Sequence, residues 1–186
     1  MTNHLDRSLT YLFVDGSCLS NHATAWAVFR VAFTSHHEYV SQQACGYLGH
    51  SSSLIAEIVA AIQALRWCSP GKNYCLVSDN QAVVNALKAV KVGKPSGTFQ
   101  HQYWFQRLRQ ELMVCQSQGT KIQVRWIKAH QTLSALPPSL TPEQVLRWGN
   151  HHADQLAAST ARAAGYAREL DELLVVEPSY AHEALA

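Results

Sequence analysis

The chain has 186 residues, an apolar fraction of 47% and a formal net charge of +2, which suits one domain with a substantial core. No apolar run reaches the roughly 18–20 residues of a membrane span, and the polar start lacks the apolar stretch of a secretory signal. The five cysteines are odd in number and show no C-x-x-C spacing, so they indicate neither a disulfide framework nor a zinc site. We therefore expect an intracellular protein, cytoplasmic or nuclear, with no membrane partner.

Basic residues are concentrated in the middle of the chain. Residues 80–142 contain eight lysines and arginines but a single acid, Glu111, whereas acids predominate after residue 167. A basic middle suits a polyanionic partner such as nucleic acid, although such faces are often simply solvated.

The pattern of apolar residues predicts an antiparallel meander followed by alternating strands and helices. The expected strands are residues 10–14, 23–33, 38–48, 74–78 and 121–127. The expected helices are residues 51–67 (capped by Ser52 or Ser53), 80–91, 99–117, 142–148 and 150–164, the last ending near Gly165.

We expect Asp15 to begin a turn, and residues 130–142 to form a loop. Trp26, Trp67 and Trp126 are expected in the core. Trp104 is expected to pack inward, and Trp148 stays open. The order β-β-β-α-β-α-α-β-α predicts an α/β fold with a mixed sheet flanked by helices.

Four acids stand where the chain enters its core. Asp15 and Asp79 follow short apolar runs, Glu57 lies in an apolar helical stretch, and Asp154 lies in the first turns of the last expected helix. Each has an ordinary structural explanation, as a turn residue, a helix cap, a solvent-directed charge or a favourable charge at a helix N-terminus. Four such positions in one small domain favour a shared site instead.

Electrostatics explains why such acids need cations. Two carboxylates about 4 Å apart repel by roughly 4 kcal/mol at an effective dielectric constant near 20, so a cluster of four is costly unless protons or cations neutralise it. Oxygen ligands favour Mg²⁺ or Mn²⁺ over zinc. Two such ions can stabilise the attacking and leaving oxygens of a phosphodiester. The basic middle of the chain would then hold the backbone of the nucleic acid.

Five motifs resemble those of type 1 ribonucleases H and occur in the order of that family. They are Asp15-Gly16-Ser17-Cys18-Leu19-Ser20-Asn21, Ala56-Glu57-Ile58-Val59-Ala60-Ala61-Ile62, Val77-Ser78-Asp79-Asn80-Gln81, Trp126-Ile127-Lys128-Ala129-His130 and Asn150-His151-His152-Ala153-Asp154. The resemblance runs from about residue 10 to residue 164. It implies the ribonuclease H-like fold, with a five-stranded mixed sheet of three antiparallel strands followed by parallel ones.

The resemblance also implies an activity and its residues. The expected enzyme is an endoribonuclease that hydrolyses the RNA strand of RNA–DNA hybrids with two Mg²⁺ ions, for which Mn²⁺ substitutes, leaving 5′-phosphate and 3′-hydroxyl ends. Asp15 would bridge both ions, Asp154 would hold the ion that activates water, and Glu57 and Asp79 would hold the other. His130 would assist proton transfer or product release. The implied substrate contacts are Gly16, Ser17, Asn21, Gln81 and Asn150.

One segment departs from the family pattern. The stretch between His130 and Asn150 is longer than in the shortest relatives and carries three prolines, so His151 and His152 stay alternatives to His130. We expect a flexible lead at residues 1–9, a catalytic domain at residues 10–165 and an acidic tail or linker at residues 166–186. The expected partners are a hybrid and other domains of a parent polyprotein, with the chain itself a monomer.

Three other classes of function make different demands on the sequence. A catalytically weak, hybrid-binding or scaffolding domain of a reverse-transcriptase-type polyprotein predicts loss of an acid, yet all four are present. Proofreading exonucleases carry D-x-E on the first strand, where this chain has Ser17, and transposases lack the helix glutamate motif. An α/β enzyme that does not act on nucleic acid is disfavoured because no glycine-rich phosphate loop is visible.

Overall fold

The computed structural model describes residues 6–34, 39–91, 101–129 and 141–176. Over these residues the predicted order of strands and helices is confirmed. The elements are β1 (Thr10–Cys18), β2 (Ala23–Phe33), β3 (Tyr39–His50), α1 (Ser53–Arg66), β4 (Asn73–Ser78), α2 (Gln81–Lys91), α3 (Gln102–Ser117), β5 (Lys121–Trp126) and α4 (Pro142–Val176). None of these helices is long and apolar enough to cross a bilayer.

The five strands form one mixed sheet in the order β3-β2-β1-β4-β5. β1 and β2 pair antiparallel, as do β2 and β3, whereas β4 lies parallel to both β1 and β5. The predicted fold class is therefore confirmed, and β1 lies at the centre of the sheet.

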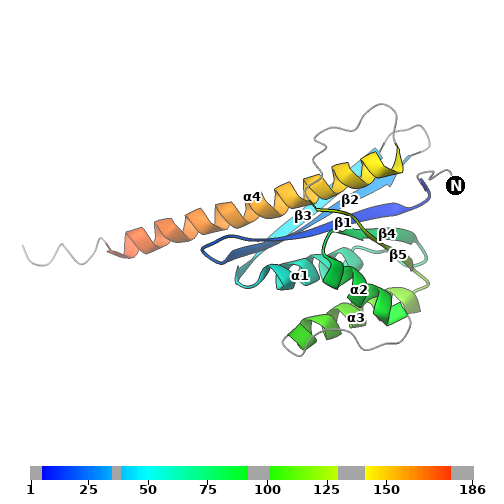
Figure 1. Cartoon of the computed structure of the whole chain (residues 1–186), viewed down its shortest axis with the longest axis horizontal. Coiled ribbons are helices and arrows are strands. Elements are labelled where there is room, and N and C mark those ends of the chain that lie inside the picture. The colour runs from blue at the N-terminus through cyan, green and yellow to red at the C-terminus, as the bar shows by residue number, and fades with distance from the viewer. Residues whose placement is uncertain (1–5, 35–38, 92–100, 130–140, 177–186) are drawn as a thin grey trace, which may run out of the picture.

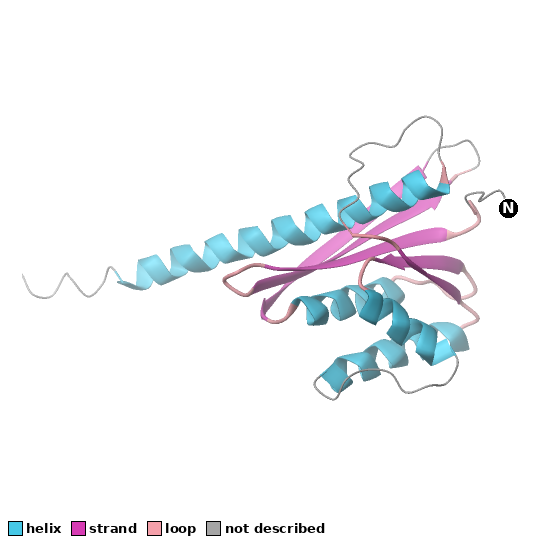
Figure 2. Cartoon of the chain, in the orientation of Figure 1, coloured by secondary structure: helices cyan, strands magenta, loops and turns pink. Residues whose placement is uncertain are grey.

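Helices cover both faces of the sheet (Figures 1 and 2). α1 packs on β1 and β2 from one side, with α2 and α3 beside it, and α4 packs on β1, β2 and β3 from the other. Because side chains alternate along a strand, Leu12 and Val14 of β1 enter the core under α1, while Phe13 enters the core under α4. The central strand is thus buried on both faces.

A single glycine brings α1 against β1. A Cβ on Gly16 would lie 2.4 Å from the backbone nitrogen of Glu57, so only glycine permits this approach. The helix begins where expected, with the Ser52 hydroxyl accepting a hydrogen bond from the Ile55 N–H at 3.2 Å. The close approach at Gly16 places the first turns of α1 directly beside β1.

The last helix differs from the prediction. We expected two helices separated near Gly149, the second ending near Gly165, but α4 is continuous to Val176 and extends beyond the sheet (Figure 1). A Cβ on Gly149 would lie 2.2 Å from the Phe13 ring, and one on Gly165 would lie 3.1 Å from Asn21 Nδ2. The two glycines therefore serve close packing within a helix rather than termination.

Two further expectations were wrong. β1 continues to Cys18, so Asp15 lies within a strand and not in a turn. Trp126 is 48% exposed, because it ends the outer strand β5, where its side chain lies outside the buried core. The other tryptophans agree better with expectation: Trp26, Trp67 and Trp104 pack against the core, and Trp148 is buried. The expected loop at residues 130–142 lies largely outside the described residues.

Candidate active site

Three of the four predicted carboxylates meet at the centre of the sheet. Asp15 lies within β1, Glu57 lies on α1, and Asp79 follows β4. Each offers a carboxylate oxygen, and these oxygens all lie within 4.8 Å of one another. Asp15 and Glu57 are buried, with exposed fractions of 6% and 5%.

The register of the sheet explains why these acids converge. β1 and β4 are parallel neighbours in which Phe13 pairs with Val77, and Asp15 and Asp79 each follow two residues later. The pairing of these two strands ends at Phe13 and Val77, so the two aspartates lie side by side just beyond it, although β1 itself continues along β2. Glu57 joins them because Gly16 lets α1 approach.

Burial and mutual repulsion perturb the cluster strongly. Burial, followed by the charges of Asp79 and Asp154, raises the pKa of Asp15 from 3.8 to about 8. Burial, followed by the charges of Asp15 and Asp79, raises the pKa of Glu57 well above its usual value. Asp154, half-buried on α4, is thus close enough to act on Asp15, although it lies outside the 4.8 Å group.

Asp79 is held at both its backbone and its side chain. Trp126 Nε1 donates to the Asp79 carbonyl at 2.9 Å, and Asn150 Nδ2 donates to Asp79 Oδ2 at 3.2 Å. Asn80, and not Asp79, caps α2, because its Oδ1 accepts from the Ala82 N–H at 3.0 Å. The Asn80 side chain also hydrogen bonds to Glu57.

Sequence reasoning missed the roles of Asn80 and Trp126. The signal for each was its place in a motif, since Asn80 directly follows Asp79 and Trp126 opens the motif that ends in His130. Asn150, which the resemblance implied as a substrate contact, is only 4% exposed and contacts Asp79.

Two buried oxygens in the site have no hydrogen-bond partner within the described part of the chain. They are Glu57 Oε2 and Asn150 Oδ1. A buried polar atom without a partner costs free energy, and an unpaired carboxylate oxygen among other carboxylates is a suitable ligand for a divalent cation. The donor set therefore fits a hard metal ion.

The remaining predicted residues lie on β1, in the turn after it and at the start of α2. Gly16 and Ser17 follow Asp15 on β1. Asn21 stands in the turn after β1, where its Oδ1 accepts from the Ala23 N–H at 3.1 Å. Gln81 begins α2 and is exposed.

The histidines are only partly placed. His130 lies outside the described residues, whereas His151 and His152 are half-buried on α4. The His152 ring lies 4.9 Å from that of Trp148 and 5.1 Å from that of Phe29. Burial, followed by the charge of His151, lowers the pKa of His152. The ring of His152 therefore packs against other aromatic rings.

A five-stranded mixed sheet whose central strand carries a buried acidic cluster defines the class of ribonuclease H-like nucleases. The RNase H family model matches residues 7–162. The chain belongs to the RNase H family and is a ribonuclease H enzyme.

Solved structures share this fold at low sequence identity. The N-terminal RNase H domain of Rv2228c from Mycobacterium tuberculosis, solved as a fusion with maltose binding protein, is 16% identical, with a TM-score of 0.60, over 87% of this chain and 99% of that chain. LC9-RNase H1, described as a type 1 enzyme with the type 2 active-site motif, is 16% identical with a TM-score of 0.62, over 86% of this chain and 74% of that one.

A foamy viral protease-reverse transcriptase in complex with RNA/DNA hybrid is also similar. It is 16% identical with a TM-score of 0.58, over 83% of this chain but only 20% of the viral one. The same fold therefore also occurs as one part of a larger polypeptide. A comparison with curated protein sequences gave no match.

Proposed function

We propose that this enzyme hydrolyses the RNA strand of RNA–DNA hybrids with two divalent ions and leaves 5′-phosphate and 3′-hydroxyl ends. The observation that carries the proposal is the buried cluster of Asp15, Glu57 and Asp79, whose oxygens lie within 4.8 Å. The hybrid as substrate is supported by family membership and by the viral neighbour that was solved with one.

The physical chemistry of the cluster favours Mg²⁺, with Mn²⁺ as a substitute. Carboxylate oxygens are the ligands these ions prefer. Burial first, and then the charges of neighbouring carboxylates, raise the pKa values of Asp15 and Glu57, so the ionised cluster is costly without a cation. When bound, such ions would neutralise that charge and supply an activated water and stabilisation of the leaving oxygen. The proposed ligands are Asp15, Glu57, Asp79 and Asp154.

The residues around the ligands would fix their orientation. We assign Trp126 and Asn150 to holding Asp79, through the two hydrogen bonds at its backbone and its carboxylate. His130 is proposed to assist proton transfer or product release. Of its two alternatives, His151 is the stronger competitor, because His152 is packed between aromatic rings.

Substrate contacts are proposed at the positions that match the type 1 motifs. Gly16, Ser17, Asn21 and Gln81 lie on β1, in the turn that follows it and at the start of α2, and all four border the carboxylate edge of the sheet or its first hairpin. Contacts to 2′-hydroxyl groups at such positions would distinguish RNA from DNA.

We propose that residues 10–165 form the catalytic unit. α4 passes this boundary without a break and continues to Val176, so the end of the unit is a helix that projects from the sheet. A helical extension of this kind would suit a connection to other domains of a parent polyprotein.

The decisive experiment is cleavage of a hybrid whose RNA strand is labelled. We expect cutting of RNA in the presence of Mg²⁺ or Mn²⁺, 5′-phosphate ends on the products, and no cutting of matched duplex DNA. Asp79→Asn should remove nearly all activity without unfolding the chain, whereas Glu143→Gln, at an exposed position on α4, should not. A wild-type protein that binds hybrid but never cuts it would favour a scaffolding role.

A further inference from the structure

The outer strand β3 is unusual in its composition. Tyr39–His50 is a 12-residue strand at one end of the sheet, and it contains no Asp, Glu, Lys, Arg or Pro. Within the described part of the chain, its outer edge pairs with no other strand. Natural edge strands are usually short or carry charges, prolines or bulges that prevent pairing with another chain, so β3 lacks most of this protection.

Apolar side chains are exposed along the same strand. Tyr39, Val40 and Tyr47 have exposed fractions of 42%, 57% and 43%. The strand is regular over residues 39–47, where each residue has a partner on β2, and its one irregularity comes after Tyr47. The regular segment is about 30 Å long, and its central residue is Gln43.

We infer that β3 is a self-association surface, on which a second copy of this chain pairs antiparallel about a two-fold axis at Gln43. A second copy is favoured as the occupant because the strand is complementary to itself in this register. With Gln43 opposite its own copy, Tyr39 lies opposite Tyr47 of the partner subunit, and Ser41 lies opposite Cys45 of the partner subunit. Aromatic pairs across strands are stabilising. The Tyr39 ring already lies 5.1 Å from that of Trp148, and its exposed part would be covered by Tyr47 of the partner subunit.

The other face of the strand is complementary in the same register. Val40 lies opposite Gly46 of the partner subunit. In each chain the Trp26 indole lies directly over Gly46, since a Cβ there would be 2.6 Å from Trp26 Nε1. The exposed Val40 would therefore pack on the indole that fills the space above that glycine.

β3 itself brings no Asp, Glu, Lys or Arg to the pairing. On the Val40 face, Arg30 of β2 donates to Gln42 Oε1 at 3.0 Å, and the strands that carry its two copies would lie three strand spacings apart, about 14 Å between their backbones. On the Gln43 face, Arg162 of α4 lines the groove beside Gln43. A two-fold contact of this kind is closed and limits the assembly to two chains.

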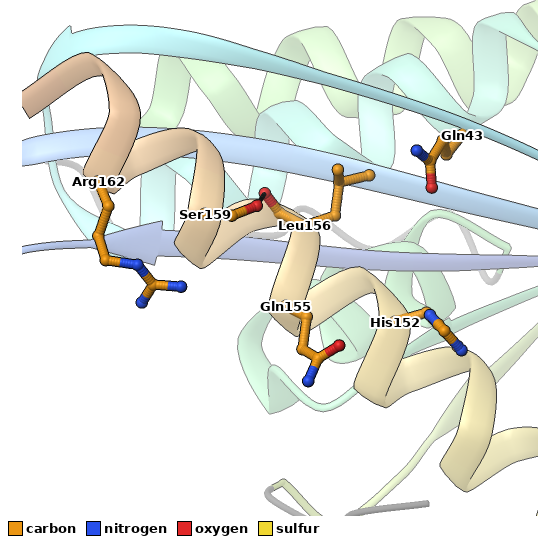
Figure 3. A pocket seen from close by; sticks show the side chains of 6 residues that line it. All are labelled: Gln43, His152, Gln155, Leu156, Ser159 and Arg162. Carbon is orange, nitrogen blue, oxygen red and sulfur yellow. Dashed lines mark hydrogen bonds between the residues drawn. The ribbon is translucent and has the colours of Figure 1, made fainter. Parts of the chain in front are cut away.

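A groove beside β3 would become part of the contact. Gln43 and five residues of α4, namely His152, Gln155, Leu156, Ser159 and Arg162, line a space of about 380 Å³ (Figure 3). β3 is the last strand on that side, so a second strand would extend the floor of this groove away from α4. β2 separates β3 from β1, which carries Asp15, and the dimer is therefore expected to retain cleavage activity. The inferred dimer differs from the monomer that we expected from the sequence.

Sedimentation equilibrium of the full chain at micromolar concentrations tests the inference. We expect a reversible monomer–dimer equilibrium. Gln43→Lys, which places like charges opposite each other at the axis, should raise the dissociation constant at least about tenfold. Gln43→Glu should do the same, and an equimolar mixture of the two variants should dimerise again. Met113→Lys, at an exposed position on α3, is the matched control and should change nothing.

A second measurement tests the register independently of those variants. Ser41→Cys should form a disulfide to Cys45 of the partner subunit, as oxidised glutathione takes up the two electrons and two protons of the thiols. Adding Cys45→Ser should abolish it. A monomeric wild type, an assembly larger than two chains, a dimer indifferent to Gln43→Lys and Gln43→Glu, or a Ser41→Cys variant that forms no cross-link would each overturn the inference. If the chain formed a complex with another protein but not with itself, β3 would instead pair with a strand of that protein.

Discussion

Replacing Asp15 with asparagine should stabilise the metal-free protein while abolishing its activity. The pKa of Asp15 is raised from 3.8 to about 8 in the folded chain, so between these values the folded state holds a proton that the unfolded state has released. The free energy of unfolding therefore falls as the pH rises through this window, by roughly 1.4 kcal/mol per pH unit. By pH 7 the accumulated loss from this one group is about 4 kcal/mol.

The substitution removes this loss because an amide does not ionise. Urea unfolding in the presence of EDTA should show that the advantage of Asp15→Asn over the wild type grows by about 3–4 kcal/mol between pH 5 and pH 8. Glu57 shifts in the same direction, so the variant keeps part of the fall with pH. Adding Mg²⁺ should stabilise the wild type more than the variant.

The control is a carboxylate outside the cluster. Glu143→Gln removes an exposed ion pair with Arg147, which contributes at most about 1 kcal/mol, and should leave the pH dependence unchanged. If the difference between wild type and Asp15→Asn were the same at pH 5 and pH 8, the electrostatic account of the cluster would be refuted.

Two further substitutions test how the site is built. Trp126→Phe keeps an aromatic side chain, although a smaller one, and removes the hydrogen bond to the Asp79 carbonyl, worth about 1 kcal/mol. It should lower kcat and raise the Mg²⁺ concentration for half-maximal cleavage without changing KM, and an unaltered Mg²⁺ requirement would argue against a positioning role. Gly149→Ala gains about 1 kcal/mol of helix propensity, but its Cβ would overlap the Phe13 ring. Overpacking costs about 1–3 kcal/mol, so thermal unfolding should show a lower Tm, and a higher Tm would contradict the close-contact explanation.

Much of the fold follows from local pattern, because the pattern reports which residues are buried. The limits of β2 were predicted exactly, and Ile58 and Leu65 lie in the core as the helical stripe required. A pattern does not report what a residue packs against. Gly149 and Gly165 were therefore interpreted as helix ends, although the Phe13 ring leaves no room for a Cβ at Gly149 and the Asn21 side chain lies close to Gly165.

For the site, too, local motifs predicted some features, whereas contacts between distant segments could not be predicted. The acids were identified from their motifs, and the convergence of Asp15 with Asp79 follows from parallel pairing of β1 and β4. The hydrogen bonds that hold Asp79 could not be predicted from the sequence, because they join segments far apart in the chain. Trp126 looked like a core residue of a strand, and only the position of β5 at the end of the sheet shows that its indole reaches the Asp79 carbonyl.

The features that create the site are also those that destabilise it. Gly16 allows α1 to lie against β1, and this approach buries Glu57 beside Asp15. Burial makes each carboxylate costly to ionise and strengthens its repulsion of the other. A larger residue at position 16 would relieve the repulsion by moving α1 away, but it would also separate the oxygens that are to hold a cation. The close contact at Gly16 therefore links the instability of the metal-free cluster to its capacity to bind metal.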